Sequence, residues 1–242
     1  MSLLAHEHFE KDGFRLCGVE LARIDAFSDV VFGFALTLLV VSLEVPKTYA
    51  ELHDSLRGFF PFAICFTFLM MVWYAHYKFF RRFGTHDFGT IVINAVLLFV
   101  VLFYVYPTKF LFTLFVFSLA GIPQHVFTDI HQMTSLMILF CLGFAGVYFL
   151  LGALYWNAWR QREALALTPV ERFLAKSYIV EALGVAVIGL IACAITLTLP
   201  PRYAGTAGSA FVLIWPFKII YGRLTRKHVQ QLRDPKRKLP RH

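Results

Sequence analysis

Charged residues are scarce in this chain. Only 16% of its 242 residues are charged, whereas 58% are hydrophobic and 27 are phenylalanines. A soluble domain of this size needs far more polar surface to enclose its core. The composition therefore excludes an ordinary soluble protein and predicts an integral membrane protein. The chain has no evident internal repeat, Gly/Ser-rich linker or separate soluble region, so we expect one membrane domain.

Cysteine is also scarce, and its spacing argues against two classes of site. The four cysteines are isolated, with no C-x-x-C pair, so neither a zinc site nor a disulfide framework is predicted. His76 has no second histidine or cysteine three or four residues away, which favours a structural role over metal binding. The N-terminal stretch has no apolar core before a small-residue cleavage site, so we expect no secretory signal peptide. We expect neither a metal nor a cofactor.

Long apolar runs are what the chain has in abundance. A helix needs about 20 mainly apolar residues to cross a bilayer. We therefore predict an all-α integral membrane protein with six transmembrane helices per subunit, near 26–45, 58–79, 89–106, 133–156, 178–199 and 205–221. Pro46 and Pro200 end the first and fifth runs, because proline cannot continue the helical hydrogen bonds. The apolar stretch beyond Pro107 is either a bent continuation of the third helix or a re-entrant or interfacial piece.

Basic residues are distributed unevenly between the two sides of these spans. One side carries 18 lysines and arginines, and the other carries four. This bias predicts that the N- and C-termini are cytoplasmic, in a multi-pass protein of the cell (plasma) membrane. We divide the chain into a transmembrane domain over residues 1–222 and a basic cytoplasmic tail over 223–242, which carries a net charge of +7. Such a tail is expected to touch anionic membrane lipid, and we expect no binding of nucleic acid.

Polar residues from distant spans fall at one depth in this topology. The layer lies near the cytoplasmic face and comprises Arg23, Ser28, Asp29, Trp73, His76, Asn94 and Glu181. The favoured interpretation is that these groups hydrogen-bond one another and lock the helices together, with Arg23 and His76 as partners of Asp29. Direct contact with a moving ion, and a proton relay through Asp29 and His76, are the alternatives.

The first span carries an apolar stripe beyond Asp29. Phe34, Leu38 and Val41 are spaced i, i+4, i+7 and share one face, which Thr37 borders. Considered alone, this stripe favours a packing face against neighbouring helices. A pore lining is the alternative.

Three segments resemble one known family. Arg23-x-x-x-Phe27-Ser28-Asp29 opens the first span, Trp73-x-x-His76 lies in the second, and Asn94 followed by Tyr106-Pro107-Thr108 lies in the third. These motifs are similar to those of the transmembrane protein 175 family of potassium channels. The resemblance extends over the whole chain, and its first-helix motif is the most specific part. A carbonyl filter sequence T-V-G-Y-G is absent from this chain, as it is from that family.

The resemblance implies a function and a role for particular residues. Prokaryotic members look like homotetramers whose first helices line a pore narrowed by apolar rings. Carried over by position, the tightest ring, a hydrophobic gate, falls on Phe34, further rings on Leu38 and Val41, and a selectivity threonine on Thr37. The structural network that holds the first helices upright corresponds to Arg23, Phe27, Ser28, Asp29, Trp73, His76 and Asn94. Where the family usually has isoleucine or leucine, this chain has Phe34, which leaves the degree of potassium over sodium selectivity open.

We therefore predict a homotetrameric, potassium-permeable cation channel with a hydrophobic constriction, potassium being the permeant species and not a cofactor. The transmembrane domain over 1–222 is then the channel domain. A secondary transporter, possibly proton-coupled, is the alternative, although such proteins usually show internal repeats or broken helices. A membrane enzyme would need a constellation of nucleophile, base or metal ligands, and only the layer around Asp29 and His76 comes close. We expect that the protein is not an enzyme.

Overall fold

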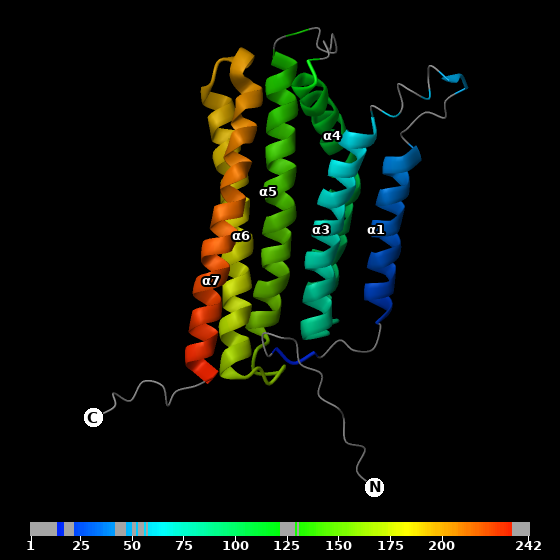
Figure 1. Cartoon of the computed structure of the whole chain (residues 1–242). Helices are drawn as coiled ribbons and strands as arrows, with labels where there is room; N and C mark the ends of the chain where they lie inside the picture. Colours follow the sequence, from blue (N-terminus) through cyan, green and yellow to red (C-terminus); the bar gives the residue numbers. More distant parts are fainter. Residues whose placement is uncertain are drawn as a thin grey trace.

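The computed structural model describes residues 14–16, 22–41, 47–49, 52, 56, 58–121, 129 and 131–233. These residues form an all-helical bundle of six α-helices and one 3-10 helix: α1 (Arg23–Val41), α3 (Phe59–Phe83), α4 (Phe88–Leu119), α5 (His131–Arg160), α6 (Pro169–Thr198), η1 (Pro201–Leu213) and α7 (Ile214–Arg233). Figure 1 shows the long helices side by side, running up and down. We call the end where α1 begins and α3, α5 and α7 finish the basal end.

Five helices are long and apolar enough to cross a membrane, namely α1, α3, α4, α5 and α6. They coincide with the first five predicted spans, although most extend past the predicted ends. Helices α4, α5 and α6 contain 30 to 32 residues, so their ends reach beyond the roughly 20 residues that the hydrocarbon core requires. The cysteine Cys17 lies outside the described residues.

The sixth predicted span, 205–221, is divided between two elements. Its first part belongs to η1, a 3-10 helix of 13 residues, and its second part to α7. Because a 3-10 helix rises about 2 Å per residue, η1 covers more length than an α-helix of equal size. Helix α7 then continues to Arg233, so the first half of the predicted basic tail is helical. Together η1 and α7 run back alongside α6 towards the basal end (Figure 1).

Helix α4 settles the question left open at Pro107. The helix is continuous from Phe88 to Leu119, with Pro107 inside it. The apolar stretch after Pro107 is therefore a continuation of the helix and not a re-entrant piece. In Figure 1 the second half of α4 leans towards α5. Its first turn is capped by Asp87, whose side chain accepts a hydrogen bond from the backbone N–H of Thr90.

Helices α5 and α6 form the most tightly packed pair, with α4 and η1 against them. Aromatic rings carry much of this packing: Phe144 contacts Phe211 of η1 at 4.8 Å between centroids, and Tyr104 of α4 lies 5.7 Å from Phe140. The Tyr104 hydroxyl donates to the carbonyl of Phe140 at 2.7 Å, which satisfies its buried polar atom. Gly143 makes this approach possible, because a Cβ there would lie 2.3 Å from the Tyr104 ring.

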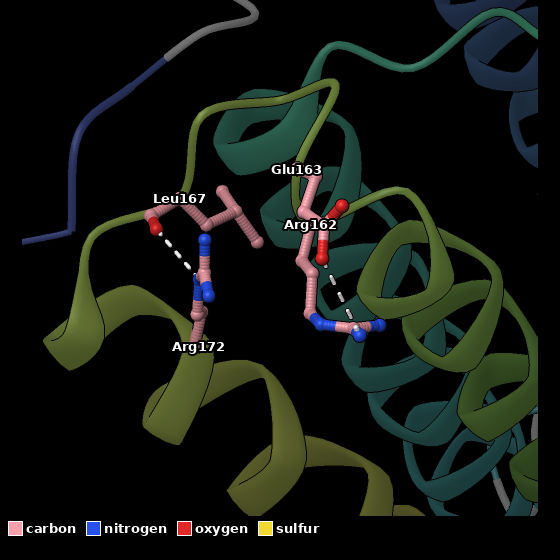
Figure 2. Close-up of polar contacts among 4 residues, drawn as sticks. All are labelled: Arg162, Glu163, Leu167 and Arg172. Atoms are coloured by element: carbon pink, nitrogen blue, oxygen red, sulfur yellow. Dashed lines mark hydrogen bonds and ion pairs between the residues drawn. The ribbon is translucent and has the colours of Figure 1, made fainter.

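The turn between α5 and α6 is closed by local contacts at the basal end. Figure 2 shows Arg172 donating to the carbonyl of Leu167, at 2.9 Å, and the ion pair between Arg162 and Glu163, at 3.7 Å. Thr168 and Glu171 complete a capping box at the start of α6, where the Thr168 side chain accepts from the Glu171 N–H. The helix start is therefore well defined.

The short segment 14–16 is attached to this basal region. Phe14 is fully buried, with its ring 5.1 Å from that of Phe83 and 5.2 Å from the Arg82 guanidinium. The backbone N–H of Arg15 donates to Glu171 at 2.9 Å, and its side chain donates to the Leu165 carbonyl at 3.3 Å. The segment that precedes α1 is therefore held against the α5–α6 turn and the end of α3.

Candidate functional site

Helix α1 has two unlike faces. Ser28, Phe32, Ala35 and Leu39 are buried, and the helix packs there against α3 and α4. The opposite face is exposed in the single chain and carries Phe27, Val30, Phe34, Thr37 and Val41. These five residues alternate in steps of three and four, which is the spacing of a helix that packs lengthwise against other helices. We call them the exposed stripe of α1.

The exposed stripe agrees in part with the stripe predicted from sequence. Phe34, Val41 and Thr37 lie on it, whereas Leu38 is only partly exposed and lies at its edge. Val30, which is 70% exposed, was missed. It precedes Phe34 by four residues, so the same periodicity could have found it. The stripe is therefore longer than predicted and extends further towards the basal end.

Thr37 stands near the middle of this stripe. Its hydroxyl donates back into its own helix, at 2.8 Å to the Gly33 carbonyl and 3.0 Å to the Phe34 carbonyl. This back-bonding satisfies the donor, while the oxygen of the exposed side chain keeps acceptor capacity on the stripe. The otherwise apolar stripe therefore carries one hydroxyl oxygen that can accept a hydrogen bond or contact a cation.

A hydrogen-bonded chain of polar groups fixes the buried side of α1. The ring nitrogen Nε2 of His76 (α3) lies 2.7 Å from the side-chain oxygen Oδ1 of Asn94 (α4). Because an amide oxygen can only accept, Nε2 of His76 is the donor. The Asn94 amide donates to the Ser28 hydroxyl at 2.9 Å, and Ser28 donates to the Ile24 carbonyl at 2.7 Å. All three side chains are at least 98% buried. We call His76, Asn94 and Ser28 the buried polar chain; it joins α3, α4 and α1.

Asp29 has a different partner from the two predicted. The indole N–H of Trp73 donates to its carboxylate at 2.8 Å, which ties α1 to α3 a second time. Among the described residues, Arg23 and Asp29 form no ion pair, and His76 bonds to Asn94 instead. Six residues separate Arg23 from Asp29, which places them about 120° apart around the helix. The expected pairing was therefore wrong, since Asp29 bonds to Trp73 and His76 bonds to Asn94.

Two other residues of the predicted layer, and Phe27 of the predicted structural network, lie elsewhere. Phe27 is 62% exposed and Arg23 is also exposed, both on the side of α1 that carries the stripe. Phe27 precedes Phe34 by seven residues, or two turns, so it shares that face. Glu181 pairs with Lys218 of α7 at 3.3 Å and does not join α1. The described network consequently contains Ser28, Asp29, Trp73, His76 and Asn94.

The arrangement favours helix locking over the chemical alternatives. The buried polar chain ends at a backbone carbonyl that is already engaged by Ser28, and Asp29 is not part of it. A proton relay through Asp29 and His76 would need a hydrogen-bonded connection between these two side chains. Within the part of the chain that the structure describes, no group of three or more His, Cys, Asp or Glu side chains is arranged to hold a metal ion.

Asp87 is a second polar junction, outside the spans. Its carboxylate accepts from the Thr90 hydroxyl at 2.6 Å and from Asn157 of α5 at 3.1 and 3.2 Å. Burial acts to raise the pKa of Asp87, but hydrogen bonds from Gln161, Thr90 and Asn157 outweigh it and hold the pKa well below its ordinary value. This junction fastens α4, and through it α1, to α5.

Known proteins are similar to this chain over the residues that build the site. The family described as endosomal/lysosomal potassium channel TMEM175 matches residues 23–104, a range that contains the exposed stripe and the whole polar network. A protein named potassium channel from Marivirga tractuosa is 36% identical over 230 residues, which is 90% of this chain and 93% of the relative. A potassium channel from Chamaesiphon minutus is 31% identical over 119 residues, covering 46% of this chain and 59% of the relative.

Two solved structures are similar to this bundle. One is a variant of the potassium channel MtTMEM175 in complex with a nanobody fusion; it has a TM-score of 0.79 and 33% identity, over 91% of this chain and 100% of that one. The other is a lysosomal potassium-selective channel TMEM175 homolog from Chamaesiphon minutus. Its TM-score is 0.54 and its identity 22%, over 82% of this chain and 96% of that one, so it supports the fold alone. The extent and identity of the Marivirga match, on residues that build one site, show that this chain belongs to the TMEM175 family.

Proposed function

We propose that this protein is a potassium-permeable cation channel whose pore is lined by the exposed stripe of α1 from several copies of the chain. The observation that carries the proposal is the stripe itself, an apolar face that the chain leaves uncovered although α1 is long enough to span a membrane. The names of the relatives support potassium as the permeant ion. Four copies around an axis, the assembly that the family resemblance implies, would bring four such faces together.

Phe34 forms the narrowest ring in this proposal. Its side chain is 59% exposed in the single chain and projects from the stripe four residues beyond Val30 and three before Thr37. An apolar ring of this kind gates by excluding water when it is narrow. The face of an aromatic ring can also attract a cation, so a ring of Phe34 side chains can narrow the path and still interact favourably with a permeating cation. Val41 forms a further ring, with Leu38 at the edge of the lining.

The polar network sets the rotation of α1 about its own axis. The buried polar chain holds Ser28 against α3 and α4, and the Trp73–Asp29 bond holds the next residue. With Ser28 fixed, the exposed stripe necessarily points away from α3 and α4. These residues therefore position the pore lining without touching the ion. Thr37 contributes the oxygen that distinguishes one cation from another.

The basal end faces the cytoplasm of the plasma membrane in this proposal, because the basic loops gather there. Residues 1–222 then form the channel domain. The basic segment from 223 onward begins as the end of α7, where Arg223, Arg226 and Lys227 are exposed. This segment lies on anionic lipid of the inner leaflet.

Purified protein in planar bilayers tests the proposal, with potassium on one side and sodium on the other. Wild type should give discrete unitary currents with a reversal potential that favours potassium. Phe34→Ala should increase unitary conductance and reduce discrimination between the two ions, because it widens the narrowest ring. Phe149→Ala is the matched control, since Phe149 of α5 is 58% exposed but lies away from α1. Saturable flux without unitary currents would instead indicate a transporter.

A further inference from the structure

A cavity of about 20 Å³ lies inside the bundle, where α1, α3, α4 and α5 meet. Helix α1 contributes Leu39 from its buried face, and α4 contributes Tyr104 and Thr108. The α3 side includes the thiol of Cys65, and the remaining side chains of the lining are apolar. A space of this size is large enough for one water molecule. The proposed conduction path does not use this cavity, because the cavity lies on the buried side of α1.

The hydroxyl of Thr108 has no hydrogen-bond partner among the described residues, although Thr108 is only 3% exposed. The Tyr104 phenol lies close to it, but the two groups do not reach the geometry of a direct hydrogen bond. Thr113 of the same helix and Thr196 of α6, by contrast, donate to the carbonyl four residues earlier, at 2.8 Å in each case. Because a buried hydroxyl is costly to leave unsatisfied, Thr108 is expected to bind a partner from outside the chain.

Three groups around the cavity can bind a water molecule together. The Thr108 hydroxyl can both donate and accept a hydrogen bond. Tyr104 donates its proton to the Phe140 carbonyl at 2.7 Å, so its oxygen remains able to accept. The Cys65 thiol is a weak donor and a weak acceptor in the same lining. A buried water usually makes about two to four hydrogen bonds, which these groups can provide.

Pro107 gives such a water a structural use. Proline has no N–H to donate to the carbonyl four residues earlier, so α4 lacks one of its hydrogen bonds next to Thr108. Membrane helices tolerate such interruptions where threonine side chains and ordered waters satisfy the polar groups nearby.

We propose that the cavity binds one water molecule, which accepts from the Thr108 hydroxyl, donates to the Tyr104 phenol and lies against the Cys65 thiol. The water ties α4, just past its proline, to α3 beside the buried face of α1. This inference requires only the helical bundle and does not depend on potassium conduction.

X-ray radiolytic footprinting of the full-length protein in detergent, followed by mass spectrometry, tests the inference. The X-ray pulse converts water into hydroxyl radicals, and a buried side chain is oxidised where a bound water lies beside it. Cys65 should be oxidised well above Cys193, a similarly buried thiol outside the cavity. In Thr108→Val, which keeps the shape of the side chain, oxidation of Cys65 should fall to the level of Cys193. Thr108→Ser keeps the hydroxyl and should retain the wild-type oxidation of Cys65. Thr196→Val, the matched control, removes a buried hydroxyl outside the cavity and should also retain it.

Thermal unfolding separates a hydrated hydroxyl from an unsatisfied one by the sign of the change. Loss of a hydroxyl that holds a water should lower the unfolding midpoint of Thr108→Val, whereas removal of an unsatisfied hydroxyl would raise it.

A raised midpoint in Thr108→Val would therefore overturn the inference. So would wild-type protein in which Cys65 is oxidised no more than Cys193, because the cavity would then hold no water. Oxidation of Cys65 that persists in Thr108→Val would mean that Thr108 does not hold the water. An equal loss in Thr108→Ser or Thr196→Val would assign the effect to packing. If Thr108→Val does not fold, the comparison of Cys65 with Cys193 in wild type decides the question.

Discussion

Helix α1 and the pair α5–α6 are all long and apolar enough to cross a membrane, yet the chain buries them to different extents. In the most apolar stretch of α1 only 22% of the residues are buried, against 50% in α5 and in α6. Helices α5 and α6 are covered by each other, by α4 and by η1. Helix α1 is held on one side by polar groups and leaves the exposed stripe on the other.

The difference separates two tasks that apolar residues perform in this bundle. In α5 and α6 they interlock with aromatic rings and small residues of the same chain, and close packing makes them sensitive to changes in volume. In α1 they form a surface, and its orientation depends on few specific bonds. We therefore expect substitutions in α5–α6 to act on stability, and substitutions on the stripe of α1 to act on ion flow.

The largest loss of stability is expected where α1 meets the other helices. Asn94→Ala removes the middle of the buried polar chain, so that Ser28 and His76 each lose their hydrogen bond to Asn94. Each buried polar group left unsatisfied costs about 1–3 kcal/mol, so the free energy of unfolding should fall by roughly 2–4 kcal/mol. Thermal and denaturant unfolding in detergent measure it. Thr113→Ala is the control, because Thr113 bonds only within α4; equal losses in both variants would contradict the role of the chain.

A pair of glycine substitutions compares the two regions directly. A Cβ at Gly143 of α5 would lie 2.3 Å from the Tyr104 ring, whereas a Cβ at Gly33 of α1 would meet nothing within 4 Å in the single chain. Gly143→Ala should therefore lower the free energy of unfolding by about 1–3 kcal/mol through overpacking. Gly33→Ala should not lower it, because alanine favours the helix. A destabilised Gly33→Ala protein would mean that α1 is tightly covered at that point.

The junction at Asp87 should make a smaller contribution, and one that depends on pH. Its pKa is lower in the folded protein than the unfolded value near 3.8. The stabilisation is therefore complete above the unfolded pKa and is lost as pH falls through the lower folded pKa. The difference in unfolding midpoint between wild type and Asp87→Asn should be constant from about pH 7 to 5 and shrink below about pH 4. A difference that grew on acidification would contradict the assignment.

Thr37→Val should have the smallest effect on stability. The change keeps the shape of the side chain and removes a hydroxyl that bonds only to its own helix. We expect the unfolding midpoint to stay within experimental error and the potassium-to-sodium permeability ratio to fall. Thr67→Val is the matched control, because Thr67 of α3 is also exposed and bonds back to the Ala63 carbonyl. A permeability ratio equal to that of wild type would leave selectivity to the apolar rings.

Hydropathy and length were sufficient to locate five of the helices. They did not locate the sixth helix correctly. The segment η1 adopts 3-10 geometry, and α7 continues through basic residues that a search for apolar runs does not include. Small residues explain η1 better: a Cβ at Gly205 would lie 3.1 Å from Met133, so this segment approaches α5 closely. Pro107 signalled an interruption in the sequence, yet the helix continues past it.

In the candidate site, the sequence likewise predicted some features of single residues and not others. Topology placed Ser28, Asp29, Trp73, His76 and Asn94 at one depth, because each lies a known number of residues from a helix end. Their partners depend on how each helix is rotated, which sequence does not specify. Asp29 therefore turned out to bond to Trp73 and not to Arg23. Phe27 belongs to the motif that identified the family but lies on the exposed stripe.

Cysteine accessibility along α1 tests most directly whether the exposed stripe lines the ion path. Single substitutions Val30→Cys, Thr37→Cys and Val41→Cys are compared with Val31→Cys and Leu36→Cys, which lie off the stripe and are partly buried. All variants carry Cys17→Ser, because Cys17 lies outside the described residues, and the protein with this change alone is the background control, since Cys65, Cys141 and Cys193 are buried. A charged thiol reagent should block potassium current through the three stripe variants and leave the other two unaffected. Block at Val31→Cys and Leu36→Cys, or no block at any stripe position, would contradict a pore lined by this face.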